Sequence, residues 1–467
     1  MKRRDFIKQS GLTAGFVAFS HISQDSYAVN GTFNELIDPL GPNQPIGEAK
    51  GVCLGRVVWA YDPDATNESC QPAVWGDGYY LDKNCNQSVV DDMFSKGIRK
   101  LTEKDSDTEA WDAIFRHFNQ NHNKGYVAYS DNEKIFIKVN SVHTNTRNFG
   151  PDGSIKDSIQ YGYVDTSPHA IMAILRQLVN EAGVPEENIY IGDPMLRNFF
   201  KHSYDKFSAE FPNINYMSLS GLPGRTMLVE SKEIGIYYSD RGTVMDETHD
   251  YFYTCLMNAD YVINIPAMKG HPLGGVTFFA KNHFGSHTRK TAAHLHKGLQ
   301  GQPDGDPLRT GYNKYRVFVD LMGSKNLGGK TLLYYMDALW STSLAHLPPT
   351  KFLSAPFNND WSSSIFLSLD PVAISSVCLE VMKKEFKEED LDADPPRHIP
   401  VQREGLDDYL HQAASSEWWP EGFVYDPENN GTPLTSLGVH EHWNNATDME
   451  YSRNLGTGDG IELVKLF

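Results

Sequence analysis

Short apolar runs alternate with helix-like patterns along most of this chain. Residues 51–60 (GVCLGRVVWA), 134–142 (KIFIKVNSV) and 188–193 (NIYIGD) are rich in β-branched and aromatic side chains and have the length of strands. Residues 108–119 (TEAWDAIFRHFN) place apolar side chains at helical spacing, and residues 167–183 (SPHAIMAILRQLVNEAG) give the clearest helical pattern. The chain therefore alternates predicted strands with predicted helices.

The order of these elements predicts a parallel sheet. Ser167 can cap the clearest helix, Pro168 suits its first turn and Gly183 suits its exit. This helix lies between two predicted strands, and a strand, a helix and a further strand form a βαβ unit whose strands run parallel. Similar runs follow at residues 260–266, 330–339 and 362–384. We therefore predict an α/β fold with mostly parallel sheets flanked by helices, built as one large domain or as two lobes.

Polar side chains stand at the carboxyl ends of several predicted strands, which is where such sheets bind ligands. A single polar residue there is more readily a turn or helix-cap residue. Several of them in one sheet favour a shared site, provided that the strands are neighbours. These residues are Asn140, His143, Asp193, Lys269, His271, Asp337 and Asp370.

The N-terminus has the three regions of an export signal. Arg3 and Arg4 form a twin arginine, the apolar run SGLTAGFVAF is too short to span a bilayer, and small residues follow in DSYA. We predict a twin-arginine (Tat) signal over residues 1–28 that engages the Tat translocase and is cleaved near Ala28. The alternative is a basic N-terminal tail. The mature protein would be periplasmic or otherwise exported, with residues 29–49 as an irregular lead-in.

The charge of the chain limits its partners. Removing residues 1–28 takes away four basic and two acidic side chains, so the formal net charge changes from −18 to −20. A chain this acidic repels nucleic acid and anionic membrane surfaces. No later apolar run approaches the length of a membrane span. We therefore expect no nucleic-acid partner and no stable membrane insertion, and an anionic ligand would need a local basic pocket.

The five cysteines contain no CxxC pair and no clustered spacing. An iron–sulfur cluster or a thiolate zinc site is therefore not expected. In an oxidising compartment Cys70 and Cys85 could bridge a loop rich in Gly, Asn and Asp, although the sequence does not fix that pairing. The odd count leaves at least one thiol free.

Histidines gather in residues 268–298, which hold five of the 17 in the chain. His283 and His287 are four residues apart, as on one helical face, although a glycine and a serine between them favour a frayed end. His294 and His296 are two apart, as on one face of a strand. A divalent metal held by these imidazoles and a carboxylate is chemically sensible. Exposed loop histidines are the commoner outcome, and no HExxH or similar signature is present.

Three lysines, Lys138, Lys269 and Lys281, lie in or beside apolar segments. A buried ammonium group is costly unless something negative meets it. The lysines either pair with the carboxylates at the strand exits or face a phosphate, carboxylate or sulfate, and a desolvated lysine can also act as a base. Gly274 and Gly275 precede a helical pattern, so their backbone N–H groups could approach an anion at a helix N-terminus, but a tight turn explains them equally well.

Four ordered blocks resemble the family known as domain of unknown function 362. The blocks are KIFIKVNSVHTN, TSPHAIMAILRQLVNEAGV with NIYIGD, ADYVINIPAMKGHPLGGVTFFAKNHFG, and LSLDPVAISSV. Their order and spacing agree over roughly residues 134–414. The strand, lysine, histidine, glycine-rich turn and Lys-Asn-x-x-Gly run of the third block is the most specific piece. Members of this family are often exported or fused to ferredoxin-like modules, and their activity is not established.

The resemblance implies a set of characteristic polar residues and two departures from the family pattern. The chain lacks the cysteine clusters of ferredoxin-bearing members, so no iron–sulfur cofactor is carried over. Ser375 stands where a second aspartate usually follows DPVA, which puts the role of that carboxylate in doubt. The residues carried over are Lys138, Asn140, Asp193, Lys269, His271, Lys281, Asn282, Gly285 and Asp370.

The family-like α/β domain is predicted over residues 50–414, followed by a C-terminal extension, residues 415–467, that ends in a strand (GIELVKL). The extension contains the triplet His440, Glu441 and His442, which could ligate a metal. Adjacent residues on a strand point to opposite faces, so we expect a structural tail there.

Together these features favour an exported enzyme that depends on a metal or another cofactor and acts on a small anionic substrate at the strand ends. The Tat route is much used for cofactor proteins, so redox chemistry is slightly favoured. The alternatives are a non-catalytic periplasmic ligand-binding or accessory protein, and lysines that only form core ion pairs. His271 would move the proton because an ordinary histidine pKa lies near neutrality. The candidate catalytic residues are His271, Lys269 and Lys281, and the candidate ligand-binding residues are Lys138, Asn140, Asp193, Gly274, Gly275, Asn282, Asp337 and Asp370.

Overall fold

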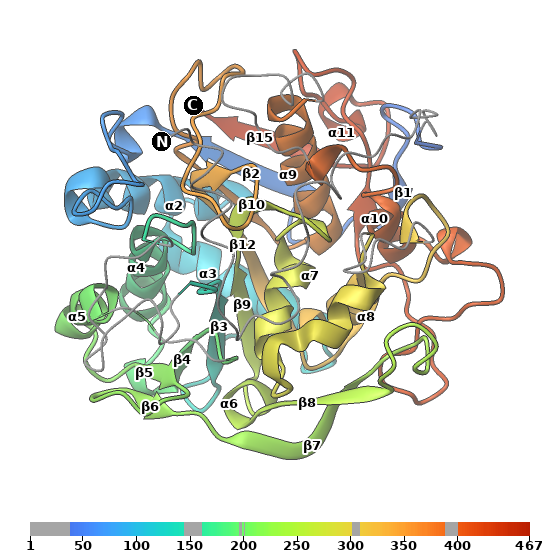
Figure 1. Cartoon of the computed structure of the whole chain (residues 1–467), viewed down its shortest axis with the longest axis horizontal. Helices are drawn as coiled ribbons and strands as arrows, with labels where there is room; N and C mark the ends of the chain where they lie inside the picture. Colours follow the sequence, from blue (N-terminus) through green and yellow to red (C-terminus); the bar gives the residue numbers. More distant parts are fainter. Residues whose placement is uncertain (1–37, 144–160, 196–198, 200, 301–308, 388–399) are drawn as a thin grey trace, which may run out of the picture.

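The computed structural model describes residues 38–143, 161–195, 199, 201–300, 309–387 and 400–467. Within these residues the main feature is a sheet of 11 strands, which runs through the centre of Figure 1. The strand order is β15-β2-β13-β12-β9-β3-β4-β5-β6, with β10 beside β12 and β11 beside β10. The strands are β2 (Arg56–Tyr61), β3 (Ile135–Val139), β4 (Ile189–Gly192), β5 (Asn215–Ser218), β6 (Thr226–Met227), β9 (Tyr261–Ile265), β10 (Ala267–His271), β11 (Gly275–Val276), β12 (Thr331–Thr342), β13 (Ser364–Ser368) and β15 (Glu462–Leu466).

Most neighbouring strands of this sheet are parallel. The pairs β9–β3, β3–β4, β4–β5, β5–β6, β12–β9, β12–β10 and β15–β2 are parallel. The pairs β2–β13, β13–β12 and β10–β11 are antiparallel. The predicted α/β fold with a mostly parallel sheet is confirmed.

Helices cover both faces of the sheet, and alternate side chains of one strand enter two different cores. In β2, Val57 and Trp59 lie in one core, whereas Val58 and Ala60 lie in the other. The second core is closed by α2 (Gln87–Thr102), α3 (Asp107–Asn121), α4 (Pro168–Arg176) and α5 (Lys201–Glu210). The first is closed by α7 (Phe279–Asn282), α8 (Val317–Gly323), α9 (Pro371–Glu385) and α10 (Asp408–Ala414), which lie together in Figure 1.

The helix predicted at residues 167–183 forms because its ends carry the right signals. The Ser167 hydroxyl accepts a hydrogen bond from the His169 N–H, and Pro168 occupies the first turn. The π-helical turn η4 (Gln177–Glu181) continues α4, and Gly183 follows with a φ of +70°. A positive φ is cheap only for glycine, so the helix ends where the sequence predicts.

The two ends of the described chain join the same body. The predicted final strand is β15, which lies parallel to β2 at one edge of the main sheet. A two-stranded sheet pairs β1 (Ile46–Gly47) with β14 (Val439–His440), and a hairpin pairs β7 (Glu230–Tyr237) with β8 (His249–Tyr253). Short helices are α6 (Thr254–Met257) and α11 (Ser452–Leu455). Turns of 3-10 helix occur at Pro63–Ala65, Asp82–Asn84, Glu186–Asn188, His283–Ser286 (η6), Lys290–Gly298 (η7), Gly328–Lys330, Pro400–Gln402 and Ser416–Trp418.

Two local expectations were wrong. The segment that holds His294 and His296 is the 3-10 helix η7 and not a strand, because Thr291 and Ala292 adopt a positive φ that turns the chain. The helical run expected from Val276 starts at Phe279, because Val276 still pairs with β10 as part of β11.

All five cysteines are free thiols, so the disulfide considered between Cys70 and Cys85 is not formed.

The predicted signal peptide lies outside the described residues, so the fold does not bear on export. Within the described ranges, no helix combines the length and the apolarity needed to cross a membrane.

Candidate functional site

The carboxyl ends of β3, β4 and β10 meet at one place, where a buried ion pair joins two predicted site residues. The Lys138 ammonium lies 2.9 Å from Oδ1 of Asp193, and both side chains are almost wholly buried. Lys138 also donates to the carbonyl of Val139 at 2.6 Å. The other Asp193 oxygen accepts from the Ser141 N–H at 2.9 Å. The pair therefore satisfies much of its own charge inside the core.

An amide network fixes this ion pair against α7. Asn282 accepts from Lys138 at 3.2 Å and donates to Oδ1 of Asn264 at 2.8 Å. The Asn264 amide in turn donates to Nε2 of His283 at 3.0 Å. A side chain at Gly285 would place its Cβ 1.8 Å from the Asp193 carboxylate, so only glycine fits there. This packing accounts in physical terms for Asn282 and Gly285 of the Lys-Asn-x-x-Gly run.

Lys269 has a carboxylate partner that the sequence did not suggest. Its ammonium lies 3.5 Å from Oδ1 of Asp165 and donates to the Val164 carbonyl. The same Asp165 oxygen lies 2.9 Å from Nδ1 of His143, and Nε2 of His143 lies 3.2 Å from Nδ1 of His346. Burial lowers the pKa of Lys269, and Asp165 opposes that shift.

Lys281 differs from the other two lysines because no carboxylate in the described residues pairs with it. Lys281 lies on the last turn of α7, and its ammonium lies 3.9 Å from the ring centre of Phe284. Burial lowers the pKa of Lys281 to about 7, and the charges of Lys269 and Lys138 act in the same direction, whereas Asp193 opposes them. The amine can therefore change its protonation state near neutral pH.

His271 lies at the end of β10 in a fixed tautomer. Its Nδ1 accepts hydrogen bonds from the N–H groups of Leu273 at 3.1 Å and Gly274 at 3.0 Å. Nδ1 must keep its lone pair for these bonds, so the proton of the neutral ring is on Nε2. Burial holds the pKa of His271 well below its usual range, and the charge of Lys281 adds to this effect.

The glycine-rich turn supports His271. The N–H of Gly274 is used by the imidazole, and Gly275 has a φ of +71° that closes the turn. The helix after the turn, α7, has only four residues. The described contacts therefore match the tight-turn interpretation of these glycines.

We call Lys138, Asp193, Lys269, His271 and Lys281 the strand-end cluster.

Three other predicted ligand-binding residues have different surroundings. Asp337 lies in β12 and accepts from the Ser167 N–H at 2.6 Å, and burial raises its pKa to about 6. Asn140 follows β3, and its Oδ1 is buried with no hydrogen-bond partner among the described residues. Asp370 caps α9, where its carboxylate accepts backbone N–H groups from Val372, Ala373, Lys50 and Val439. Asp370 thus has a structural place away from the strand-end cluster.

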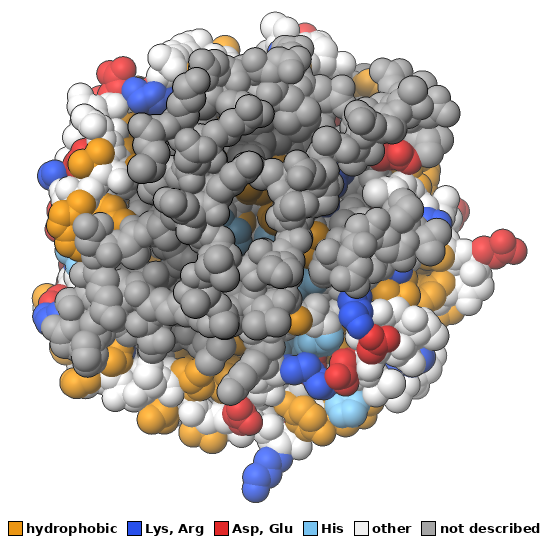
Figure 2. Space-filling model, in the orientation of Figure 1, with side chains coloured by type: hydrophobic (Ala, Val, Ile, Leu, Met, Phe, Trp, Pro, Cys, Tyr) orange, Lys and Arg blue, Asp and Glu red, His pale blue; other side chains and the backbone are white. Residues whose placement is uncertain are grey.

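The four candidate metal histidines make different hydrogen bonds, although the rings of His287 and His294 are neighbours, with ring centres 6.2 Å apart. His283 is bonded to Asn264 and Ser286, and His287 bonds the His283 carbonyl at 2.9 Å through Nδ1. Nε2 of His294 lies 2.5 Å from Asp250, near a group of ion pairs, and Figure 2 shows basic, acidic and histidine side chains together over α8 and β8. The His296 ring stacks on that of His271, with ring centres 5.7 Å apart.

Metal-ligand spacing occurs elsewhere in the described part of the chain. The two groups of three or more potential ligands whose ligand atoms lie within 4.8 Å of one another are His411, His440 and His442, and Asp38, Asp407 and His442. Neither group includes any of the four histidines of residues 283–296.

The sequence model of the family described as Domain of unknown function (DUF362) matches residues 154–380. The chain belongs to this family. No curated protein matches it. The matched region of this DUF362 protein holds Asp193, Lys269, His271 and Lys281, whereas Lys138 and the histidines after residue 380 lie outside it.

Sequence reasoning missed three residues that complete the surroundings of the strand-end cluster in this DUF362 chain, Asp165, Asn264 and His346, and the contact that His143 makes there. Asp165 lies just before the helix cap at Ser167, and a carboxylate next to such a clear cap was a usable signal. Asn264 stands within an otherwise apolar strand, which is also unusual. No local sequence pattern indicates the contact between His143 and His346, because long-range pairing brings these two residues together.

Proposed function

We propose that this protein is an exported enzyme that binds a small anionic substrate at the strand-end cluster. The local charge supports this proposal. Two of the three lysines have carboxylate partners at 2.9 and 3.5 Å, whereas Lys281 has none among the described residues. An ammonium group kept from water and from a counter-ion is costly unless a ligand supplies the negative charge.

The roles of the two central side chains follow from their hydrogen bonds. Lys281, with a pKa lowered to about 7 by burial, can take or give a proton at neutral pH. His271 keeps its Nε2 proton because Nδ1 accepts from two backbone N–H groups. We therefore assign proton transfer to Lys281, and hydrogen-bond donation to the substrate to Nε2 of His271. Lys269 and Lys138 add positive potential around the anion.

A metal or redox cofactor remains part of this proposal because of the predicted export route. Proteins that take up such a group in the cytoplasm often use the Tat system. Elemental analysis and an absorption spectrum of the exported protein test this part directly. A chromophore, or a stoichiometric metal that binds outside the group of His411, His440 and His442, supports it, and a colourless, metal-free, folded protein contradicts it.

The main alternative is a non-catalytic binding protein in which the same lysines hold a ligand. Lys281→Arg separates the two functions, because arginine keeps the positive charge but does not deprotonate in proteins. For an enzyme, we expect Lys281→Arg to bind the anion and lose turnover. For a binding protein, wild type itself shows no turnover and Lys281→Arg retains affinity.

The first experiment is a thermal-shift screen of phosphate, sulfate and small di- and tricarboxylates against the exported protein. At least one anion should stabilise wild type and not Lys281→Met. Lys232→Met is the matched control, because Lys232 is exposed on β7. If wild type and Lys281→Met respond alike to every anion, Lys281 does not hold the ligand.

A further inference from the structure

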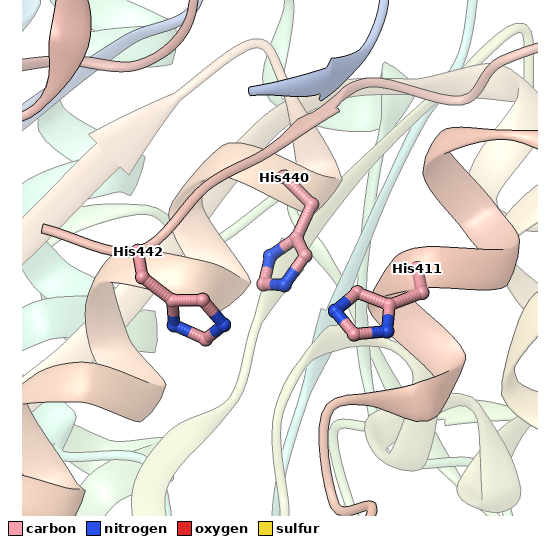
Figure 3. Close-up of side chains that lie close together, drawn as sticks. All are labelled: His411, His440 and His442. Atoms are coloured by element: carbon pink, nitrogen blue, oxygen red, sulfur yellow. The ribbon is translucent and has the colours of Figure 1, made fainter. Parts of the chain in front are cut away.

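Three histidines from two distant segments converge in the C-terminal part of the fold. His411 lies in α10, His440 lies in β14, and His442 follows two residues later. Figure 3 shows the three rings turned toward one another. The ring centres of His411 and His440 lie 4.7 Å apart, and those of His440 and His442 lie 5.0 Å apart. Their nearest ring nitrogens lie within 4.8 Å of one another. We call these three residues the C-terminal histidine cluster.

The hydrogen bonds of His440 leave one nitrogen without a partner. Ser376 donates its hydroxyl proton to the Val372 carbonyl at 2.8 Å, so its oxygen must accept from Nδ1 of His440, also at 2.8 Å. Nε2 of His440 therefore carries a lone pair, and this atom is buried with no hydrogen-bond partner among the described residues. Leaving a buried acceptor unpaired is unfavourable, which points to a ligand.

His411 shows the same deficit more strongly. Its side chain is fully buried, and neither ring nitrogen has a hydrogen-bond partner in the described part of the chain. Nε2 of His411 lies 3.5 Å from Oδ1 of Asp38, which is close enough for attraction but lacks hydrogen-bond geometry. Two neighbouring imidazoles thus present unused nitrogens to one space.

Carboxylates complete the surroundings. Nε2 of His442 lies 2.9 Å from Oδ2 of Asp38, and its Nδ1 lies 2.5 Å from Glu380. A carboxylate behind an imidazole is the usual outer shell of a metal-bound histidine. Asp407 is already bonded by Tyr312 at 2.9 Å and Lys383 at 2.7 Å, so Asp38 is the better placed fourth ligand.

We propose that His411, His440, His442 and Asp38 bind one divalent transition-metal ion of the zinc class. Three imidazoles and one carboxylate are a ligand set that zinc accepts in tetrahedral geometry, whereas magnesium and calcium prefer oxygen ligands. Ligands of tetrahedral zinc lie about 3.4 Å apart, so binding draws the three ring nitrogens, which now lie within 4.8 Å of one another, closer by up to about 1.4 Å. The Nε2 proton of His442 leaves as the metal binds, and its Nδ1 proton stays on the bond to Glu380.

The ion would have a structural role, because protein side chains fill all four positions. It would tie residue 38 near the start of the described chain to α10 and to β14, which are far apart in sequence. This site is separate from the strand-end cluster and does not depend on the proposed enzymatic function.

The test uses the mature protein after export, stripped with a chelator, loaded with Zn²⁺ and analysed for bound metal. Wild type should retain one zinc per chain. His411→Gln and His440→Gln should each weaken zinc binding at least about 100-fold, because changes in the outer shell alone cost 10- to 100-fold. His169→Gln is the matched control, since His169 is also buried and bonded to a carboxylate, Asp82, at 3.0 Å.

A wild-type chain that retains no zinc, or a His440→Gln variant that retains it as wild type does, overturns the proposal. If the glutamine variants do not fold, anomalous diffraction from wild-type crystals at the zinc edge decides the question without a variant. A peak among the three rings supports the site, and a peak only elsewhere contradicts it. Lys281→Met should keep its zinc, so failure of this site and failure of the strand-end proposal remain distinguishable.

Discussion

The strand-end cluster and the C-terminal histidine cluster are both buried, but they leave different groups without partners. In the first, Lys138 and Lys269 have carboxylate partners, and one ammonium group, Lys281, has no counter-ion among the described residues. In the second, nitrogen lone pairs of His411 and His440 are unused. An unpaired cation calls for an anion, and unpaired imidazole nitrogens call for a metal. Two buried polar clusters in one fold thus point to ligands of opposite charge.

The largest expected effect tests the ion pair of the strand-end cluster. Asp193→Ala leaves the Lys138 ammonium buried without its carboxylate, so the free energy of unfolding should fall by about 3–5 kcal/mol in urea titrations. The double variant Lys138→Met with Asp193→Leu should recover more than half of that loss, because it also removes the buried charge. A single variant as stable as wild type would show that the pair contributes little.

The next effect concerns the histidine cluster. If zinc binds there, chelation should destabilise wild type by about 3–4 kcal/mol when free zinc had been 100 to 1,000 times its Kd. Thermal unfolding with and without chelator measures the change. His440→Gln should unfold at one temperature in both conditions, whereas Lys281→Met should still respond. An equal response of wild type and His440→Gln to the chelator would show that the stabilising metal binds outside this cluster.

Substitution of Asp370 should have a smaller effect, and it distinguishes a structural role of this residue from a ligand-binding role. Asp370→Ala removes the cap of α9 and the acceptor for Lys50 and Val439, so the free energy of unfolding should fall by about 2 kcal/mol. Affinity for an anion identified in the screen should not change at a temperature where the variant is folded. A loss of anion affinity without a loss of folding stability would show that Asp370 binds the ligand.

The predictable parts of this protein are those that local signals determine. The cap at Ser167, the proline after it and Gly183 fix both ends of one helix, and the apolar runs fix the main strands. The spacing of His294 and His296 misled because residues two apart fit a strand, while the 3-10 helix there depends on the backbone turn at Thr291 and Ala292. The strand-end lysines lie near one another. The position of Asp165 beside the Ser167 cap was a usable signal, but its pairing with Lys269 arises from long-range packing that spacing does not encode.

The C-terminal triplet shows a missed inference. Adjacent strand residues do point to opposite faces. This rule places His440 and His442 on one face and Glu441 on the other. The structure agrees, since Glu441 is buried elsewhere and accepts the N–H groups of Ser452 at 2.7 Å and Ile461 at 2.9 Å. The third ring, His411, comes from a helix 29 positions earlier and could not be assigned to the group from spacing alone.

A pH-dependent effect sharpens the contrast at Lys281. Its pKa is lowered from 10.5 to about 7 by burial, so between pH 7 and 10.5 the unfolded chain binds more protons than the folded one. Stability therefore rises with pH across that window, and the cost of the buried charge is fully present below about pH 7. Lys281→Met should be more stable than wild type at pH 6, and the difference should shrink toward pH 10. Anion affinity of wild type should show the reverse trend and weaken up to about tenfold per pH unit above 7, because only the protonated amine attracts the anion. Urea titrations and calorimetry at pH 6, 8 and 10 measure both trends, with Lys232→Met as the control. A Lys281→Met variant that is less stable than wild type at pH 6 would mean that a counter-ion already pairs with this ammonium group.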